Sequence, residues 1–309
     1  MLRLTLFTAT LLAAAAPASA LDVGEIWSAA AQRTVSLADF DAALARADVV
    51  ILGEIHDHPG HHTGQAQIIR RLAAAGAPPV VVLEMLPASA QPAIDAHRAG
   101  PDPDADGFAT ATAWDEHWFG FGLYRPVIAA ALAAGAPIRA GDLDVADKRS
   151  IGRGGPDAID ADERRRLGLD RPFPEQLSSD LGRVLIEAHC GKLPEAAVPA
   201  MIAVQRARDG AMAAALRAAK ADAPNSTAVL VAGEGHARHD WGVPFVLRET
   251  APDLVTVAVG FVEAGRETDA PVPTGADGAP LFDFAVAVPP RGGGGNPDPC
   301  AGIGEAAPK

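Results

Sequence analysis

The sequence predicts an α/β protein with a mainly parallel sheet flanked by helices. Two observations carry this prediction. Short runs of β-branched and other apolar residues, typical of strands buried on both faces, recur along the chain. Longer segments rich in helix-forming residues lie between them, and strands that alternate with helices favour a parallel sheet with right-handed crossovers.

In the first half of the chain, three strands are expected, at residues 48–53, 80–85 and 138–143. Helices are expected between them at residues 59–75, 88–98 and 124–134. The first of these helices begins at Pro59, a residue suited to a first helical turn, and ends at Gly76 and Pro78. A loop rich in Pro, Asp and Gly separates the other two.

The second half begins with an interruption. Residues 146–174 are rich in Asp, Arg, Gly and Pro, which indicates an irregular connection. The elements expected after it are helices at 175–188, 195–221 and 241–249, and strands at 227–233, 256–262 and 282–288. Residues 146–224 are therefore interpreted as a helical insertion between the third and fourth strands of a single domain, 21–309, with a loose C-terminal strap at 289–309.

Composition limits the function classes. Of 309 residues, 49% are apolar and 21% charged, which suits a folded chain with a sizeable core. The net charge of -13 argues against a nucleic-acid binder, which needs a basic face, and against docking on anionic lipid. No stretch after residue 20 has the 18 consecutive apolar residues of a membrane span. A small-molecule ligand is expected, and a homodimer is left open.

Residues 1–20 have the pattern of a secretory signal peptide. Arg3 precedes an apolar run from Leu4 to Ala16, and Ala18-Ser19-Ala20 is a small-residue cleavage site. The sequence therefore predicts an exported protein, most simply a periplasmic one.

Export gives the two cysteines a meaning. An even count in an oxidising compartment favours a Cys190–Cys300 disulfide, which would tie down the strap. Two free structural thiols and a reactive Cys190 beside His189 are the alternatives.

Histidine and carboxylate side chains follow the expected strands. Ligands of parallel sheets bind beyond the carboxyl ends of the strands. Two Gly-Glu-x-His tetrapeptides close the first and fourth expected strands, and four of the nine histidines lie between His56 and His62. The candidate site residues at these ends are Glu54, His56, His61, His62, Glu84, Glu234 and His236.

This set favours metal or acid/base chemistry. His56, Glu84 and His236 are candidate ligands of a divalent ion such as iron or zinc, with Glu54 or Glu234 as general base toward a bound water. Structural roles are the alternative: capping by Asp57, solvated histidines in a first helical turn, and hydrogen bonds from loop amides to Glu84.

An aromatic segment is a second candidate. Tyr124 is the only tyrosine in the chain and follows Trp114, Trp118, Phe119 and Phe121. These rings can form a wall for a flat ligand or simply a core segment, and the composition favours the core.

Several separated motifs together resemble the ChaN-type haem-binding uptake family of the Tiki/TraB and erythromycin-esterase-like superfamily. In chain order these motifs are Gly53-Glu54-x-His56-Asp57-x-Pro59-x-His61-His62, Leu83-Glu84-Met85, Tyr124-x-Pro126, His189-Cys190-Gly191, Gln205 with Asp209, Gly233-x-Gly235-His236 and Asp298-Pro299-Cys300. The resemblance implies an exported α/β protein with a role in haem or iron acquisition.

The resemblance also implies roles for particular residues. In its haem-binding branch, a tyrosine is expected to ligate the haem iron, and here only Tyr124 is available. Arg125 is then the expected partner of a propionate, and His61 and His62 are further cofactor-binding candidates. The chain departs from the family pattern at Asp142, where the family has Asn, and this adds a negative charge to the site.

Two functions follow from these interpretations. The first is an exported haem- or iron-binding protein. The alternative is a divalent-metal-dependent hydrolase, a peptidase or esterase, that uses the Gly-Glu-x-His residues. A structural domain with a vestigial site is a third idea, disfavoured because Glu and His are intact at the strand ends.

Overall fold

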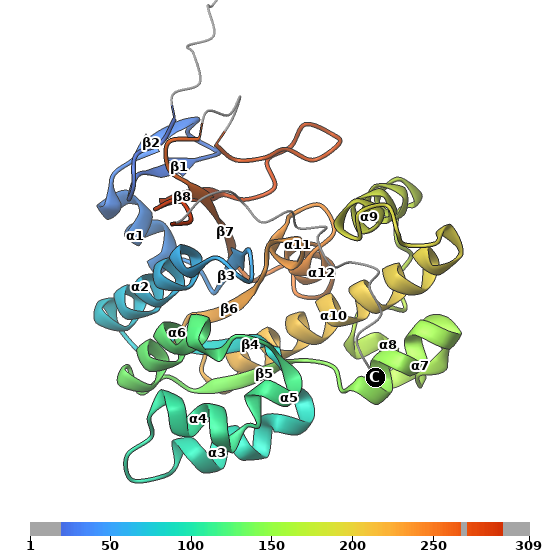
Figure 1. Cartoon of the computed structure of the whole chain (residues 1–309), viewed down its shortest axis with the longest axis horizontal. Coiled ribbons are helices and arrows are strands. Elements are labelled where there is room, and N and C mark those ends of the chain that lie inside the picture. The colour runs from blue at the N-terminus through green and yellow to red at the C-terminus, as the bar shows by residue number, and fades with distance from the viewer. Residues whose placement is uncertain (1–19, 267–270, 293–309) are drawn as a thin grey trace, which may run out of the picture.

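The structure is a computed structural model that describes residues 20–266 and 271–292. Its centre is an eight-stranded sheet in the order β2-β1-β8-β7-β3-β6-β4-β5 (Figure 1). The strands are β1 Ile26–Ser28, β2 Arg33–Val35, β3 Val49–Glu54, β4 Val80–Pro87, β5 Ile138–Asp142, β6 Ala228–Gly233, β7 Thr256–Glu263 and β8 Phe284–Val288. β3 to β8 are mutually parallel, whereas β1 pairs antiparallel with both β2 and β8. The predicted α/β fold with a mainly parallel sheet is confirmed.

Helices cover both faces of this sheet. They are α1 Leu37–Ala45, α2 Pro59–Ala75, α3 Gln91–Arg98, α4 Ala105–Ala111, α5 Trp114–His117, α6 Phe121–Ala133, α7 Val145–Gly154, α8 Ala161–Arg166, α9 Glu175–Ala188, α10 Val198–Asp222, α11 Glu234–Ala237 and α12 Val243–Thr250, with short 3₁₀ turns at η1 Ala88–Ala90, η2 Gly155–Ala158 and η3 Glu195–Ala197. None of the helices in the described ranges has the length and apolar character needed to cross a bilayer.

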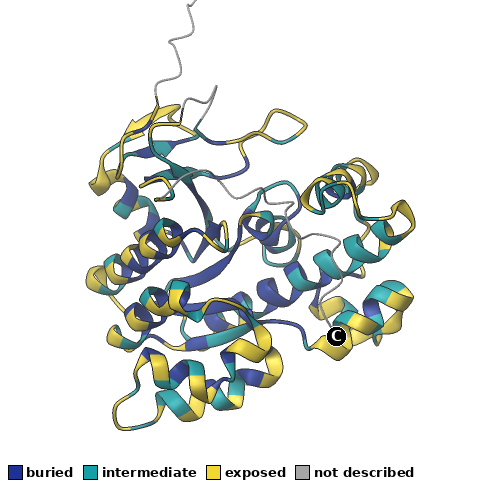
Figure 2. Ribbon diagram, viewed as in Figure 1, coloured by how far each residue is buried: buried dark blue, intermediate teal, exposed yellow. Residues whose placement is uncertain are grey.

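Alternate side chains of the central strands point to opposite faces of the sheet, and each face has its own hydrophobic core. Val50 and Leu52 of β3 face α1, α2 and α6 on one side, while Val49 and Ile51 face α10 and α12 on the other. Both sets of side chains are fully buried, as the dark strands of Figure 2 show. This burial on both faces is the reason that the strands appear in the sequence as unbroken apolar runs.

The register of the sheet sets the position of the polar residues. β3 lies between β7 and β6, and Glu54 is level with Gly233 at the carboxyl end of β6. The carboxyl end of β4 lies on the other side of β6. The ends of the first, second and fourth predicted strands therefore meet at one edge of the sheet.

Several elements differ from the sequence prediction. Residues 146–174 are not simply irregular, because α7, η2 and α8 lie within them, and the loop predicted before residue 124 contains α4 and α5. α4, α5 and α8 are only seven, four and six residues long, and α7 contains two glycines, so neither region shows a clear helical period in the sequence. β1, β2 and α1 are not among the predicted elements; the two strands have only three residues each, too few to show a period.

Three terminal predictions fall outside the described residues. These are the signal peptide, which covers residues 1–20, most of the strap at 289–309, and Cys300. The Cys190–Cys300 disulfide therefore stays a prediction. Between β5 and β6 the chain forms α7 to α10, while the insertion boundaries at 146 and 224 stay an interpretation.

The β5 edge of the sheet is closed by a side chain. The Gln91 amide donates from Nε2 to the Ile138 carbonyl (3.1 Å) and accepts at Oε1 from the Ala140 N–H (2.8 Å). One side chain thus occupies a donor and an acceptor that the last strand would otherwise expose.

Candidate functional site

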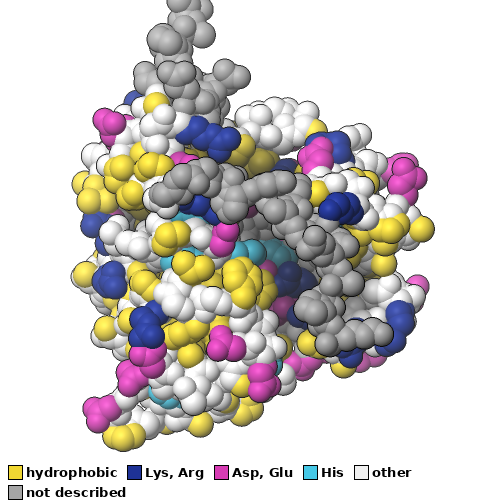
Figure 3. Space-filling view, viewed as in Figure 1, with side chains coloured by type: hydrophobic (Ala, Val, Ile, Leu, Met, Phe, Trp, Pro, Cys, Tyr) yellow, Lys and Arg dark blue, Asp and Glu magenta, His cyan; other side chains and the backbone are white. Residues whose placement is uncertain are grey.

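Two groups of buried polar side chains lie at the carboxyl edge of the sheet. Figure 3 shows histidine, basic and acidic side chains gathered near the middle of this face. We call them the Glu54 cluster and the Glu84 cluster, after the carboxylate at the centre of each. The Glu54 cluster consists of Glu54, His56, His62, Gln65, Trp118 and Tyr124. The Glu84 cluster consists of Glu84, Asp142, Lys148, Gln205, Arg208, Asp209 and His236.

Glu54, the last residue of β3, is surrounded by donors. Its Oε1 accepts from Tyr124 Oη (2.5 Å) and His56 Nδ1 (2.9 Å), and its Oε2 accepts from Gln65 Nε2 (2.6 Å) and lies 3.2 Å from His62 Nδ1. Burial alone would raise the pKa of Glu54, but hydrogen bonds and positive charge from the two histidines outweigh it and lower the pKa to about 2. Glu54 is therefore an ionised, hydrogen-bonded anchor, a state ill suited to a general base.

His56 is the member of the Glu54 cluster that reaches the surface. A third of its side chain (33%) is exposed, and Glu54 holds its Nδ1. Its Nε2 has no hydrogen-bond partner within the described part of the chain. The ring meets Trp118 edge-on at 5.0 Å and Phe119 at 6.4 Å, and Phe119 is itself 53% exposed. The edge of the sheet thus presents an imidazole nitrogen beside an exposed aromatic surface.

Tyr124 lies beneath this surface. Its side chain is fully buried, its hydroxyl donates to Glu54, and it accepts a hydrogen bond from Trp118 Nε1 (3.1 Å). Burial and the Glu54 charge raise its pKa well above the ordinary value for tyrosine. Of the two interpretations of the aromatic segment, the core describes Tyr124 and Trp114, while Trp118 and Phe119 lie nearer the surface.

His61 and His62, on the first turns of α2, play different parts. His62 is buried against Glu54, whose charge raises the pKa of the imidazole despite burial, and its Nε2 lies 2.8 Å from the His56 carbonyl. His61 Nδ1 accepts from the Ile55 N–H (3.0 Å), and burial lowers its pKa to about 3, so this ring is neutral. His58 caps α2 by accepting from the Gly60 N–H. His58 and His61 thus take structural roles, because each accepts a hydrogen bond from a backbone N–H group.

In the Glu84 cluster, the cationic side chains of Arg208 and Lys148 hold the carboxylates. Glu84, in β4, accepts from the Gly233 N–H (2.6 Å) and from Arg208 Nη2 (2.7 Å). Arg208 also donates from Nε to Asp142 Oδ1 (3.0 Å), and Lys148 Nζ donates to Asp142 Oδ2 (2.6 Å). Burial would raise the pKa of Glu84, but His236 and Arg208 hold it well below its usual range.

His236 is fixed between two carboxylates. Its Nδ1 lies 2.6 Å from Asp209 Oδ1 and its Nε2 lies 3.2 Å from Glu84 Oε1. Burial opposes a charge here, but Glu84 and Asp209 raise the pKa of His236 to about 9, so the ring is an imidazolium at neutral pH. Only 6% of its side chain is exposed.

The two clusters approach each other at Gly233. A Cβ on Gly233 would lie 2.8 Å from His56 Cε1 and Nε2 and 3.6 Å from Glu84 Oε2. Only a glycine leaves room for the His56 ring in its present position, which gives the glycine of the second Gly-Glu-x-His tetrapeptide a steric role.

The remaining site predictions are placed differently. Glu234, proposed as a general base, is exposed, and Arg125 forms an ion pair with exposed Asp106 of α4. Within the described residues, no group of three or more His, Cys, Asp and Glu side chains is arranged to hold a metal ion, so the divalent-metal alternative is not supported.

Sequence reasoning did not assign site roles to Gln65, Lys148, Gln205, Arg208 and Asp209. Three of them lie on α10 with spacings of three and four residues, which puts them on one helical face. That spacing is the signal that was available, because a polar stripe on an otherwise Ala-rich helix indicates a facing polar partner.

Comparison with known proteins identifies the class. The model of the family described as "Haem-binding uptake, Tiki superfamily, ChaN" matches residues 41–247, more than half of the 309-residue chain. The chain belongs to this family, and the resemblance stated from its motifs is confirmed.

A solved structure shows the same fold. The structure described as cofacial heme binding to ChaN of Campylobacter jejuni is similar with a TM-score of 0.67 and 19% identity, over 86% of this chain and 96% of that one. The type III effector HopBA1 is similar at a TM-score of 0.48 and 14% identity (82% and 92% covered), and an erythromycin esterase mutant, EreC, in its open conformation at 0.40 and 14% (83% and 80% covered). Among curated proteins, none matches the sequence.

Proposed function

We propose that this protein binds haem at the edge of the sheet around His56, as an exported carrier in iron acquisition. One observation on the chain itself carries the proposal: the imidazole of His56, one third exposed, lies beside the partly exposed Trp118 and the exposed Phe119. Membership of the haem-binding uptake family supports it. Export is supported by the signal-like pattern of residues 1–20.

His56 has the properties of a histidine that would bind the haem iron. A histidine that binds a metal usually donates its other ring N–H to a carboxylate, which fixes the tautomer and increases the basicity of the free nitrogen. Glu54 fulfils this condition because it is ionised and 2.9 Å from His56 Nδ1. The lone pair of His56 Nε2 would then be available to hold the iron of a bound haem, and Phe119 would offer apolar surface to the porphyrin.

Tyr124 is the competing ligand. Coordination through its oxygen requires that the hydroxyl lose its proton and that Trp118 release its hydrogen bond. A raised pKa and full burial oppose both changes in this conformation. We therefore propose His56 as the ligand in this chain, with Tyr124 fixing the position of Glu54.

Haem titration followed by the Soret band tests the proposal. The protein is expected to shift the Soret band of added haem, His56→Ala to weaken binding by on the order of tenfold or more, and Tyr124→Phe to retain it. His117→Ala is the matched control, because His117 is exposed on α5 next to Trp118. An unshifted Soret band in the wild type would refute haem binding. Binding that survives His56→Ala but is lost in Tyr124→Phe would refute only the choice of ligand.

A further inference from the structure

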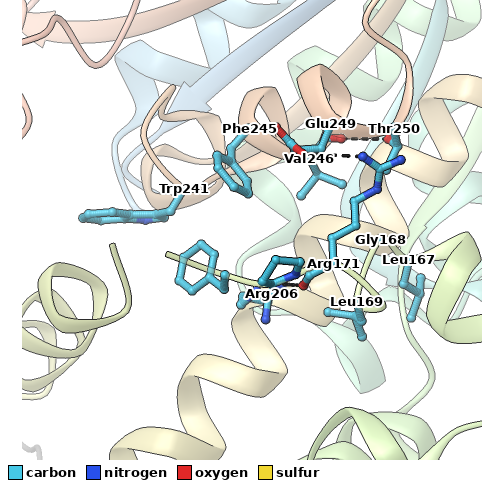
Figure 4. Close-up of a pocket in the computed structure, with 12 residues that line it drawn as sticks. Leu167, Gly168, Leu169, Arg171, Arg206, Trp241, Phe245, Val246, Glu249 and Thr250 are labelled. Atoms are coloured by element: carbon cyan, nitrogen blue, oxygen red, sulfur yellow. Dashed lines mark hydrogen bonds and ion pairs between the residues drawn. The ribbon is translucent and has the colours of Figure 1, made fainter. Parts of the chain in front are cut away.

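A cavity of about 20 Å³ lies away from both clusters, between the 167–173 loop, α10 and α12 (Figure 4). None of the residues that line it belongs to the Glu54 or the Glu84 cluster. It has room for one small polar group, such as a carboxylate or a single water. Arg206 of α10 and the aromatic side chains Phe173, Trp241 and Phe245 are among its walls.

Arg206 brings an uncompensated positive charge into this cavity. Its guanidinium lies 4.4 Å from the centre of the Phe173 ring, and among residues 20–266 and 271–292 its hydrogen bond is a long one, 3.4 Å, to the Arg171 carbonyl. Within the described residues, no carboxylate lies within ion-pair distance of it. Burial lowers the pKa of Arg206, although Asp209 acts in the opposite direction.

The other charges at the cavity are compensated. Arg171 and Glu249 form an ion pair at 3.5 Å, drawn in Figure 4, and about half of each side chain is exposed. This ion pair is partly exposed, and its two charges balance each other. Arg206 is therefore the side chain that attracts an anion, because a half-buried guanidinium gains much from a carboxylate that accepts two of its N–H groups.

The walls favour an apolar body on that anion. Phe173 and Phe245 meet edge-to-face at 5.7 Å, and Trp241 lies beside them, covered on one face by Arg238 at 3.6 Å. Arg248 lies 5.3 Å from the Phe245 ring. Together these rings give the cavity an apolar, aromatic wall beside the Arg206 guanidinium, and such a wall favours a flat apolar group.

We propose that this cavity is a binding site for a small monocarboxylic acid with a flat apolar body, whose carboxylate pairs with Arg206. The site is independent of haem, so either proposal can fail without the other.

Benzoate is the probe, with neutral benzamide as its isostere. The chain has four tryptophans, and Trp241 alone lines the cavity, so its indole N–H signal, assigned through Trp241→Phe, reports on binding in an NMR titration. Benzoate is expected to shift this signal saturably, with little change in that of Trp118, and benzamide to shift it much less.

The Arg206→Gln variant tests whether benzoate binding depends on the positive charge of Arg206 or only on the shape of the cavity. The change is expected to weaken benzoate binding by on the order of tenfold, the usual effect of losing a charge-assisted hydrogen bond. Arg217→Gln is the matched control, because Arg217 is also a half-buried arginine of α10 without a carboxylate partner in the described residues, and it should bind benzoate as the wild type does. An unsaturable shift, equal shifts with benzamide, or unchanged affinity in Arg206→Gln would overturn the proposal. The benzoate and benzamide comparison decides the matter even if Arg206→Gln does not fold.

Discussion

The Glu54 and Glu84 clusters have the same plan and opposite character. Each places a buried carboxylate at the end of a parallel strand and each carboxylate contacts a histidine. Glu54 is held mainly by a phenol, an amide and two imidazoles, and its His56 is a third exposed. Glu84 is held by a guanidinium and an imidazolium, and its His236 is almost fully enclosed.

This difference shows that the two Gly-Glu-x-His tetrapeptides are not two copies of one function. In the first, Glu54 contacts the histidine of its own tetrapeptide. In the second, Glu234 is exposed, and His236 is held by Glu84 and Asp209 from other elements. The first tetrapeptide presents a partly exposed imidazole, whereas His236 of the second connects the edge of the sheet to α10 through Asp209.

Removal of the cation should have the largest effect. In Arg208→Met, Glu84 and Asp142 lose their shared guanidinium and remain in a buried site, which costs on the order of 3 to 5 kcal/mol of unfolding free energy. Urea denaturation measures this loss. Arg125→Met, which breaks an exposed ion pair, is the control and should cost less than about 1 kcal/mol. Equal losses in the two variants would show that the Glu84 cluster does not depend on Arg208.

The charged imidazole of His236, held between Glu84 and Asp209, should make the unfolding free energy depend on pH. His236 has its pKa raised to about 9 from 6.5, so its contribution is fully present below pH 6.5 and is lost as the pH rises toward 9. The expected fall in unfolding free energy is on the order of 1 to 3 kcal/mol. Denaturation curves between pH 6 and 9 measure it. His236→Gln should flatten this dependence, and a variant that keeps the wild-type slope would contradict the assignment.

The phenol of the Glu54 cluster should matter less. Tyr124→Phe removes one of four donors to Glu54 and the acceptor of Trp118 Nε1, so we expect a loss of about 1 to 2 kcal/mol. Trp118→Phe, which removes the indole donor and leaves a smaller aromatic ring, is the comparison for the same denaturation experiment. A Tyr124→Phe protein as stable as the wild type would mean that Gln65 and the histidines hold Glu54 without it.

The sequence predicted β3, β4 and β6 well because each begins as a short apolar run that is followed by a glutamate. Glu54, His56, Glu84 and His236 follow from that pattern together with the rule that parallel strands end at one edge. α7 and α8 were missed because their many charges, which include the Arg166–Glu163 pair one turn apart, resemble a loop.

The partners of the histidines were harder to predict. Arg208 and Asp209 lie more than a hundred residues from Glu84 in the sequence. Both are on α10, a helix whose orientation over the sheet is not specified by any local pattern. The same applies to the enclosure of Tyr124, because Trp118, just after α5, reaches the Tyr124 hydroxyl only through tertiary packing. Local sequence defines which side chains reach the edge; packing decides which of them meet solvent.

Gln91 has a consequence for how copies of this protein meet. A side-chain amide has the same donor and acceptor as a peptide group, so Gln91 lies against β5 as a fragment of a ninth strand would. A further β-strand can add there only after displacing it. Self-association by sheet extension at this edge is therefore blocked by one residue on the first turn of α3, whatever contacts other surfaces make.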